Sequence, residues 1–554
     1  MYTNIYKNKC QPIEYTFYVN SLIKTLTIGK KYITMNNMLK DFIQYNLEYG
    51  FFYDNKYHKS KSGKTITIKS PIDNEIVGSL QDMTTDEVDT VVSSSSKAYS
   101  LWKNTNISDR SKILHSVAKI IRKNKYILID LLIKEVGKSY KESTDEVLRS
   151  ADITDFYAEE GQRIYGEVLT SDMFKGYKKG KIAITKRVPI GIVLSIPPFN
   201  YPLNETIPKI VGALISGNTT ILKAPSQGGI TNIILGEIFR EAKLPDGVLN
   251  IISGNSSIIG DYIVQKEEIQ GINFTGGTNT AMHIQGLIAK RNKPFPVILM
   301  GLSGKDAAIV LKDADIDKTV DNIADGAFLY SGQRCTAIKR VLVEEDIADE
   351  FIKRLKEIVE KKYILGNPND KNYLLGPVIN DQSKTHIESL LNDALKKGAK
   401  LITGGKINGR YIDAIILDNV KDNMDIAWKE QFGPILPIIR VKNLDQAIDI
   451  ANKSEYGLQS SIFTKDLNKA FEAAEKLEVG SVQINGKDSR GPDNFPFNGI
   501  KGSGYGNIQG AKYFAPSFIF SRTLSILGNS WLVIFIQAYV LSSFNKWKRF
   551  KRSW

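Results

Sequence analysis

Sulfur and imidazole are scarce in this sequence. The chain of 554 residues has two cysteines, Cys10 and Cys335, and four histidines. Two cysteines give no disulfide framework, which fits a reducing compartment such as the cytoplasm. The histidines are far apart and have no companions at ligand spacing, so each is expected on the surface or in packing, and no metal site is predicted.

The sequence also lacks a recognisable secretory signal and a nucleic-acid-binding motif. No short positive stretch is followed by an uninterrupted apolar core near the N-terminus. The net charge of +14 suits an anionic small substrate as well as a nucleic acid or a membrane. Basic and acidic residues are interleaved through the middle of the chain, so nucleic-acid binding is the weaker hypothesis.

The chain divides into three zones. Residues 1–48 form an extension rich in Asn, Tyr and Lys. From about residue 51 to residue 526, short apolar runs alternate with amphipathic helices, a pattern typical of parallel α/β sheets. The last segment, 528–554, is first apolar and then basic. The length predicts a large enzyme with two or more domains.

Helix signals and apolar runs define the α/β pattern. Thr84 and Glu87 have capping-box spacing. A helical stripe is formed by Ile316, Val320, Ile323 and Ala327. The runs predicted as strands are IGIVLSI (190–196), TTILK (219–223), GVLNII (247–252), GINFT (271–275) and AAIVL (307–311). Because parallel sheets bind ligands beyond the carboxyl ends of their strands, the loops after these runs are candidate sites.

Three of these loops contain residues suited to catalysis or ligand binding. The first, PPFNYP, contains Asn200, whose amide could donate to a developing oxyanion. In the second, Lys223 ends a strand and Ser226 follows it. In the third, Gly276 and Gly277 would let backbone N–H groups approach a phosphate at the start of a helix. Taken singly, an Asn or a pair of glycines in a loop more often serves to form the turn than to bind a ligand.

Cys335 lies in YSGQRCTAIK, between a basic residue and a hydroxyl. A thiolate there would be a strong nucleophile. A lone cysteine is also commonly a small buried packing residue, and Cys10 in the extension is interpreted in that way. From the residues alone, both interpretations of Cys335 stay open.

Six motifs, taken in order, resemble the aldehyde dehydrogenase superfamily over about residues 50–526. They are PFNYP, the strand-end Lys223, FTGG, SGQRCTAIKRVLV, EQFGPILPII and NFPFNGIKGSG. Within the superfamily, four stretches resemble the non-phosphorylating glyceraldehyde-3-phosphate dehydrogenases: GQRCTAIKR, AEEGQRIYGEV, NKSEYGLQSSIFT and SRGPDNFPF. The resemblance implies oxidation of glyceraldehyde 3-phosphate to 3-phosphoglycerate with NADP, through a cysteine thioester and without an acyl phosphate.

The resemblance also implies an α/β fold with a Rossmann-like cofactor domain, an α/β catalytic domain and a small oligomerisation arm. Members assemble as dimers or tetramers, and the arm strands here would be KIAITKRV and FIFSRTLSI. The expected segments are the extension (1–48), the cofactor-binding domain (49–300, with arm strands near 170–188), the catalytic domain (301–485), a return segment with an oligomerisation strand (486–527) and the tail (528–554).

By resemblance, Cys335 attacks the aldehyde carbon. Asn200 and the Cys335 backbone N–H would hold the tetrahedral oxyanion. The subgroup's pocket for the substrate phosphate maps onto four positions, with Thr336 in the same wall. These positions are Arg149, Tyr201, Arg334 and Arg490. Guanidinium groups suit phosphate oxygens because they donate in pairs.

For the cofactor, the resemblance assigns Lys223 and Ser226 to the adenosine ribose. NAD-preferring relatives tend to have Glu where Ser226 stands, and a carboxylate would repel a 2′-phosphate, so NADP is favoured. The other cofactor positions implied are Pro197, Asp261, Gly276, Gly277, Glu430 and Phe432.

The catalytic motif departs from the family at one position. Where relatives have E-L-G-G-K, the stretch VILMGLSGKD has Gly301 in place of the glutamate that activates the hydrolytic water. Three outcomes stay open. A water or a neighbouring group substitutes, another acyl acceptor such as coenzyme A is used, or turnover is lost and the protein only binds its ligands.

The tail raises a separate question. Between Arg522 and Lys546 no charged residue occurs. This stretch reaches the length of a membrane span, about 20 residues, although part of it is expected in the last strand of the fold. A basic cluster follows and would favour an anionic surface. Membrane association through the tail, a buried or interfacial helix, and an incorrect terminus all stay open.

Overall fold

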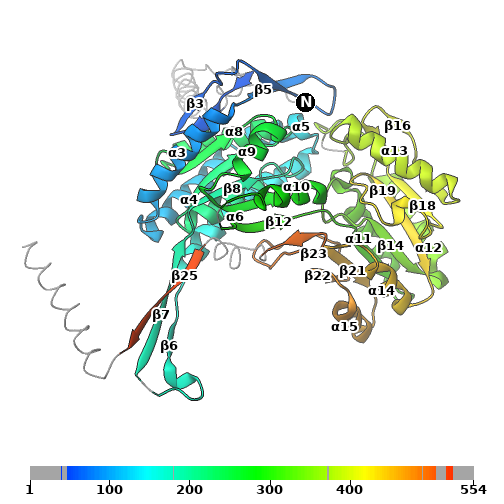
Figure 1. The fold of residues 1–554 in the computed structure, drawn as a ribbon. Coiled ribbons are helices and arrows are strands. Elements are labelled where there is room, and N and C mark those ends of the chain that lie inside the picture. The colour runs from blue at the N-terminus through cyan, green and yellow to red at the C-terminus, as the bar shows by residue number, and fades with distance from the viewer. Residues whose placement is uncertain are drawn as a thin grey trace, which may run out of the picture.

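The computed structural model describes residue 39, residues 47–506 and residues 519–527, with the exception of positions 179, 293, 371, 372 and 490. The described chain forms two large sheets that lie side by side and a smaller arm that projects from the first of them (Figure 1). The α/β architecture predicted from the sequence is confirmed.

The first large sheet contains eight strands, namely β2 (Phe51–Tyr53), β3 (Lys56–His58), β8 (Ile192–Ile196), β9 (Thr219–Lys223), β10 (Leu249–Ile252), β11 (Ile269–Thr275), β12 (Val297–Gly301) and β24 (Gly504–Tyr505). Their order in the sheet is β24-β12-β11-β8-β9-β10-β2-β3. The central strands β12, β11, β8, β9 and β10 are parallel, and the pairs at both edges are antiparallel.

Helices cover both faces of the first sheet. One face carries α4 (Ile107–Lys123), α5 (Lys125–Val136), α6 (Tyr140–Glu160), α7 (Thr206–Ile215) and α8 (Gly229–Glu241). The other carries α3 (Thr85–Trp102), α9 (Asp261–Val264) and α10 (Thr278–Ile288). A three-stranded sheet packs beside α8 and consists of β1 (Glu48–Tyr49), β4 (Thr65–Lys69) and β5 (Ile76–Gln81).

The second large sheet contains seven strands, namely β13 (Ala307–Val310), β14 (Arg340–Glu344), β15 (Lys400–Thr403), β18 (Ile415–Asp418), β19 (Ile435–Val441), β21 (Gln459–Phe463) and β22 (Ser481–Ile484). Their order is β15-β18-β19-β14-β13-β21-β22, and only the β15–β18 pair is antiparallel. One face packs on α11 (Ile316–Phe328) and α12 (Glu345–Lys362). The other packs on α13 (Asp381–Lys396), α14 (Leu444–Asn452) and α15 (Leu467–Lys476).

Local signals in the sequence explain several of these elements. Thr84 caps α3 through a reciprocal capping box with Glu87, as the spacing predicts. In α11, Val320, Ile323 and Ala327 are buried, which confirms the predicted stripe. Each apolar run that was predicted as a strand forms one, because β8 to β11 and β13 fall within or across those runs.

The strand order of the first sheet locates a ligand crevice. From β8 the chain proceeds outward through β9 and β10, and then returns to the other side of β8 to form β11 and β12. The direction of winding therefore reverses between β8 and β11. In open α/β sheets, ligands bind at this point beyond the carboxyl ends of the strands. Immediately after β12, residues 302–306 carry the chain into the second sheet.

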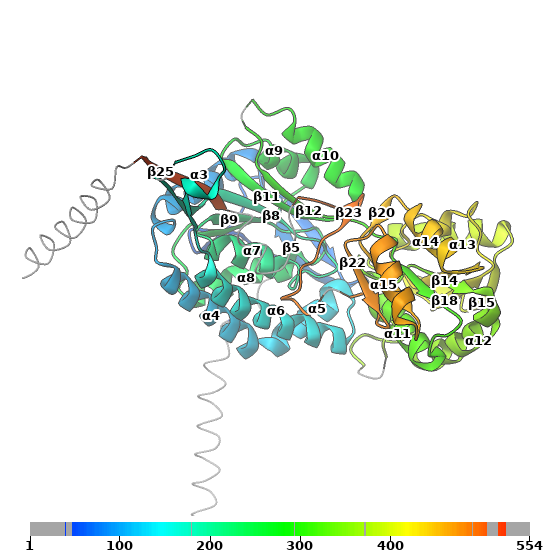
Figure 2. The same ribbon diagram turned by 90° about the horizontal axis from the view of Figure 1, so that it is seen from below.

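The arm is a three-stranded antiparallel sheet made of β6 (Val168–Thr170), β7 (Lys181–Pro189) and β25 (Ile519–Leu527). It projects away from both large sheets (Figures 1 and 2). Its two long strands pair along their whole length, from Lys181 opposite Leu527 to Pro189 opposite Ile519. The two segments that the sequence predicted for the arm therefore lie side by side.

Within the described part of the chain, no helix has both the length and the apolar character needed to cross a bilayer. Residues 1–38 and 40–46 of the N-terminal extension, and the tail 528–554, lie outside the described residues. Membrane association through the tail has no support in the structure. The cytoplasmic location and the domain boundaries stay predictions.

Candidate active site

The segment that carries the thiol is a tight turn between the two large sheets. It begins as a 3-10 turn, Leu329–Gly332, in which Tyr330 (φ 53°) and Ser331 (φ 52°) both adopt the left-handed conformation. Such backbone persists only where its surroundings hold it. The Tyr330 hydroxyl donates to the Val136 carbonyl at 3.1 Å, which ties the turn to the first half of the chain and presents Cys335 between the halves.

The surroundings of Cys335 favour the protonated thiol. Burial, and after it the nearby carboxylate of Glu205, raise the pKa of this thiol to about 12. The Lys339 ammonium acts in the opposite direction. Its Nζ donates to the Cys335 carbonyl oxygen and lies 3.3 Å from Glu430 Oε1. Since a thiolate is the reactive form, the thiol must lose its proton before it can attack.

Asn200 supplies an amide donor beside the thiol. It lies in the loop after β8 and is 5% exposed. Its Nδ2 donates to the Gln333 carbonyl at 2.9 Å, two residues before Cys335. An amide nitrogen has two N–H groups, so this bond leaves one of them for a ligand. The structure therefore brings together the predicted nucleophile and the predicted oxyanion donor.

Arg334 is buried next to the nucleophile. Its Nη2 donates to the carbonyls of Asp325, at 3.1 Å, and Gly326, near the C-terminal end of α11. Its Nε is buried and has no hydrogen-bond partner among the described residues. Thr336, on the other side of Cys335, is also buried. A guanidinium with an unused donor is suited to an anion that enters from the substrate side.

Tyr201 joins this cluster through a lysine that sequence patterns did not single out. The ammonium of Lys138 lies 3.5 Å from the Tyr201 ring centroid and pairs with the Glu146 carboxylate. Burial raises the pKa of Tyr201 above its usual value, and the charge of Arg334 lowers it. VGKSYKE has no distinctive motif, so only the three-dimensional contacts identify Lys138 as part of the pocket wall.

Arg149 reaches the same region from α6. Its guanidinium binds the Asp493 carboxylate in a bidentate manner, through Nη2 at 2.9 Å and Nε at 3.2 Å. This pairing shows the donor geometry that a phosphate would use. A Cβ atom placed on Gly491 would lie 3.3 Å from Arg149 Nη2, so the loop that contains Asp493 rests directly on the guanidinium.

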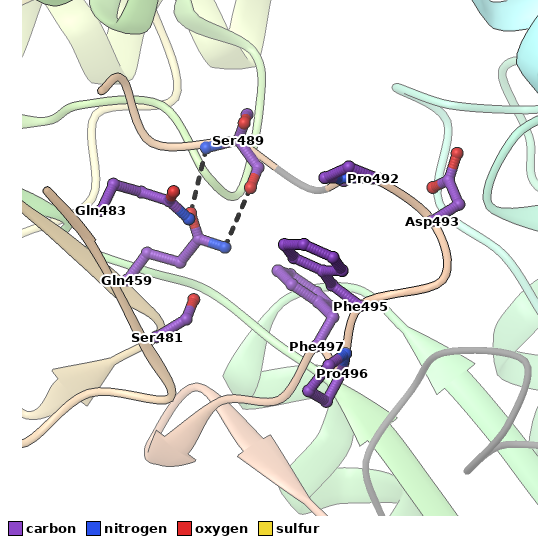
Figure 3. Close-up of a pocket in the computed structure, with 10 residues that line it drawn as sticks. Gln459, Ser481, Gln483, Ser489, Pro492, Asp493, Phe495, Pro496 and Phe497 are labelled. Atoms are coloured by element: carbon purple, nitrogen blue, oxygen red, sulfur yellow. Dashed lines mark hydrogen bonds between the residues drawn. The ribbon is translucent and has the colours of Figure 1, made fainter. Parts of the chain in front are cut away.

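The loop 489–497 lines a small cavity at this place (Figure 3). Gln459 of β21 holds the start of the loop, since its Nε2 donates to the Ser489 carbonyl at 3.1 Å and its Oε1 accepts from the Ser489 N–H at 3.0 Å. Phe495 lies further along the loop and faces into the cavity (Figure 3). Arg490, predicted to bind phosphate, lies outside the described residues, but both of its neighbours belong to this loop.

At the carboxyl edge of the first sheet, Lys223 ends β9 and is 4% exposed. Its Nζ donates to Ser256 Oγ at 2.7 Å, its one hydrogen bond within the described chain. Burial lowers the pKa of this ammonium to about 8. An ammonium has three N–H donors, so two remain for a ligand. Ser226 follows in the same loop and is exposed. The positive charge of Lys223 and the small uncharged side chain of Ser226 suit a ribose that carries a 2′-phosphate.

Gly276 and Gly277 connect β11 to the N-terminus of α10. Gly276 N–H donates to the Gly301 carbonyl at 3.1 Å, and a Cβ on Gly277 would meet no atom within 4 Å. There is thus room beside Gly277 at the N-terminus of α10, and the phosphate contact expected there stays a prediction. Pro197 directly follows β8, the strand that lies between β11 and β9 in the sheet.

The remaining predicted cofactor positions lie apart from one another. Asp261, the first residue of α9, pairs with His283 Nε2 at 2.9 Å. Glu430 accepts from the Gly304 N–H at 3.0 Å in the crossover between the sheets. Phe432 has a left-handed backbone (φ 46°) and packs edge-on against the ring of Phe199. Glu430 and Phe432 therefore lie close to the turn that carries Cys335. Asp261 lies apart from them, on the face of the first sheet that carries α3 and α10.

Gly301 ends β12 and offers no acid or base. In the structure, a carboxylate that the sequence did not predict lies nearby, because Glu205 immediately precedes α7, whose residues are all buried. Glu205 and Lys209 at the start of a mostly apolar stretch, with the spacing of an i, i+4 pair, are the signal that could have identified it. Glu205 accepts from Thr275 Oγ1 at 3.3 Å, and Thr275 lies opposite Gly301 in the sheet.

Comparisons with known proteins agree with this geometry. Residues 57–522 match the aldehyde dehydrogenase family. The chain is 46% identical over 452 residues to an NADP-dependent glyceraldehyde-3-phosphate dehydrogenase of Streptococcus equinus, a match that covers 82% of this chain and 93% of the relative. A Pisum sativum protein of the same name is 41% identical, with 83% and 91% covered. The solved structure of the Bacillus halodurans protein of that name, complexed with NADP, is 41% identical, with a TM-score of 0.83 and 86% and 99% covered.

Lys223 predicts a pH limit for the binding of NADP. Because the pKa of its ammonium is lowered to about 8, the charge that attracts a phosphate is lost above that pH. We expect the Kd of NADP to rise by up to about tenfold per pH unit above this pKa. Titration calorimetry on both sides of this pKa measures the dependence. Lys223→Met is expected to bind weakly and without this dependence, and a constant Kd for the wild type would contradict the assignment.

Proposed function

The chain belongs to the aldehyde dehydrogenase family, and we propose that it oxidises glyceraldehyde 3-phosphate to 3-phosphoglycerate with NADP, through a cysteine thioester and without an acyl phosphate. The observation that carries this proposal is the position of Cys335, between the Asn200 amide and the basic cluster around Arg334. The names of the relatives support both the substrate and the cofactor.

The reaction begins at the sulfur of Cys335. Once the thiol has lost its proton, the thiolate attacks the aldehyde carbon, and a C–S bond forms while the carbonyl oxygen becomes an oxyanion. The remaining N–H of Asn200 and the Cys335 backbone N–H donate to this oxyanion. Donors that are already fixed in place stabilise the developing charge without reorganisation, which is commonly the largest catalytic contribution.

The substrate phosphate is bound by the basic cluster. Arg334 can donate from its Nε, which has no partner among the described residues. Arg149 can donate from Nη2 and Nε, which now bind the Asp493 carboxylate at 2.9 Å and 3.2 Å. The phosphate competes with the Asp493 carboxylate, so its binding is expected to shift the loop 489–497. Fixing the phosphate fixes the aldehyde carbon relative to the sulfur.

NADP fits the carboxyl edge of the first sheet, where Lys223 and Ser226 would hold the adenosine end and the N-terminus of α10 the pyrophosphate. When bound, it supplies the two-electron oxidant that brings the aldehyde carbon to the acyl level. Ser226 adds no negative charge beside a 2′-phosphate. Water then cleaves the thioester on Cys335 and releases the acid.

Two alternatives arose from Gly301, namely acyl transfer to coenzyme A and loss of turnover. None of the relatives described above is named for coenzyme A acylation. The described residues supply a thiol at Cys335, an amide donor at Asn200 and guanidinium donors at Arg149 and Arg334, which supports a complete oxidation. Oxidation to the free acid is therefore the function that we propose.

Cys335→Ser is expected to lower NADPH formation from glyceraldehyde 3-phosphate by at least about 10³-fold, because a neutral hydroxyl replaces the nucleophile. Absorbance at the NADPH band measures the rate, and intact mass spectrometry detects the acyl adduct on the wild-type cysteine. Cys10→Ser is the matched control and should keep both signals. Normal turnover by Cys335→Ser would refute the thioester route.

Arg149→Ala should raise the KM for glyceraldehyde 3-phosphate at least about tenfold, equivalent to about 1.4 kcal/mol, and change the KM for unphosphorylated glyceraldehyde little. The reason is that the proposed role of the guanidinium is to bind the phosphate and not the aldehyde group. Arg163→Ala, just beyond the C-terminal end of α6, removes a guanidinium that pairs with Glu160 and serves as the control. Equal losses for both aldehydes would remove Arg149 from the phosphate pocket.

The arm supports a further part of the proposal, that the chain forms dimers or tetramers. Val168, Leu169 and Ile184 on its strands are 66%, 46% and 41% exposed. Apolar side chains gathered on a projecting sheet are typical of a surface that another subunit covers. Sedimentation velocity should show a dimer or tetramer at micromolar concentration, and Ile184→Lys should shift it to smaller species. A monomeric wild type would exclude this role for the arm.

A further inference from the structure

Gly301 leaves the thioester without a base at the position where the family motif has a glutamate. The residue closes β12, where it pairs with Thr275 of β11 on one side and with Gly504 of β24 on the other. Its carbonyl accepts from the Gly276 N–H at 3.1 Å. Hydrolysis of a thioester requires that a water molecule give up a proton as it attacks, so another group near Cys335 must take that proton.

Glu205 lies in the right place to act on such a water. Its side chain is 10% exposed, so it is enclosed but still reachable by solvent. Its Oε2 accepts a hydrogen bond from Thr275 Oγ1 at 3.3 Å. Thr275 is the direct neighbour of Gly301 across the sheet. The Glu205 carboxylate thus lies next to position 301, where the family motif has its glutamate.

The Glu205 carboxylate also acts on the nucleophile itself. Of the charged groups that influence the pKa of the Cys335 thiol, Glu205 has the largest effect, ahead of Lys339, Asp306 and Glu430. The backbone supports the same arrangement. Glu205 lies five residues after Asn200, whose Nδ2 donates to the Gln333 carbonyl at 2.9 Å, two residues before Cys335. The Glu205 N–H donates to the Tyr201 carbonyl at 3.0 Å, which keeps the carboxylate on the loop that contacts the thiol turn.

Lys209 orients the carboxylate. It lies one turn further along α7, with Nζ 3.5 Å from Glu205 Oε2, 2.6 Å from Thr275 Oγ1 and 3.3 Å from Asn273 Oδ1. This ammonium is 1% exposed and balances a charge that would be costly if it were buried alone. Buried ion pairs contribute little net stability, so stability alone does not explain why an otherwise apolar helix begins with these two residues.

The other two carboxylates near the sulfur are less suited to the task. Glu430 is held by the Gly304 N–H at 3.0 Å and by Lys339 at 3.3 Å. Asp306 is 1% exposed, and its Oδ1 accepts from the Gln459 N–H at 3.3 Å. A general base needs access to water as well as a place beside the reacting group. The Glu430 side chain is 15% exposed and that of Glu205 10%, so both can be reached by solvent. Of the three, Glu205 is the one that a hydrogen bond from Thr275 holds beside the strand position of Gly301.

We propose that Glu205 is the general base that deacylates Cys335, in place of the glutamate absent at position 301. Glu205 takes a proton from water as the water oxygen attacks the thioester carbonyl carbon. The resulting oxyanion is held by Asn200 and then collapses, which breaks the C–S bond and releases the acid and the Cys335 thiolate. The proton on Glu205 returns to solvent. Lys209 and Thr275 are positioning residues for the carboxylate.

This proposal rests on the proposed function, and a pre-steady-state experiment separates the two. Wild-type enzyme is mixed with glyceraldehyde 3-phosphate and NADP, and NADPH is followed from the first turnover. For Glu205→Gln we expect a burst that keeps an amplitude of about one equivalent per site, followed by turnover slowed by about 10²- to 10⁴-fold. The acyl adduct on Cys335 should then accumulate and be visible by mass spectrometry.

Rescue separates a catalytic role from a structural one. Adding Gly301→Glu to Glu205→Gln should restore part of the turnover, because it returns a carboxylate to the family position. Glu237→Gln is the matched control, since Glu237 is 4% exposed and pairs within its own helix with Arg240 at 2.7 Å. It should leave both burst and turnover unchanged. If Glu205→Gln does not fold, Glu205→Asp is expected to show the same split between burst and turnover.

Several outcomes would overturn the inference. One is wild-type turnover by folded Glu205→Gln, and another is a loss of the burst together with turnover that Gly301→Glu does not restore. A third is wild-type turnover that depends on added coenzyme A, since water would then not be the acceptor. No burst and no adduct in the wild type would instead refute the proposed function on which the inference rests.

Discussion

The hydrogen bond from Asn200 Nδ2 to the Gln333 carbonyl, 2.9 Å long, is the contact on which the geometry of the site depends. It joins the loop after β8 in the first sheet to the turn that carries Cys335 beside the second. Gln333 is itself fixed, because its Oε1 accepts from the Ile379 N–H at 2.8 Å and the side chain is fully buried. This bond therefore fixes Asn200, the predicted oxyanion donor, relative to the turn that carries Cys335, the predicted nucleophile.

Three cations of the site are paired with carboxylates before any substrate binds. Arg149 is paired with Asp493, Lys138 with Glu146, and Lys339 with Glu430. Such pairing is required because an isolated charge in a poorly solvated pocket is costly. It also means that a substrate phosphate has to compete with carboxylates already present. Selectivity for a phosphate then depends on its charge, since a phosphate carries more negative charge than the carboxylate that it displaces.

Much of the fold and part of the site could be predicted from the sequence because they depend on local patterns. The apolar run TTILK forms β9, and Thr84 and Glu87 cap α3 as their spacing indicates. Cys335 and Asn200 were recognisable because each lies in a motif. Lys138 and Glu205 were not, because their importance comes from contacts with residues far away in sequence, such as Tyr201 and Thr275.

Some functional groups of the site can be supplied from a different position in the sequence, and others cannot, because the geometric demands on them differ. The nucleophile and the oxyanion donors act on two atoms of the same carbonyl group, so their relative positions are fixed to within a few tenths of an ångström. A general base acts on a water molecule, which can approach along a range of directions. This freedom is what the proposal for Glu205 requires, because that carboxylate immediately precedes α7, whereas the family glutamate would stand at the end of β12. The turn that presents the thiol has no such freedom, because its left-handed residues are held by contacts with both halves of the chain.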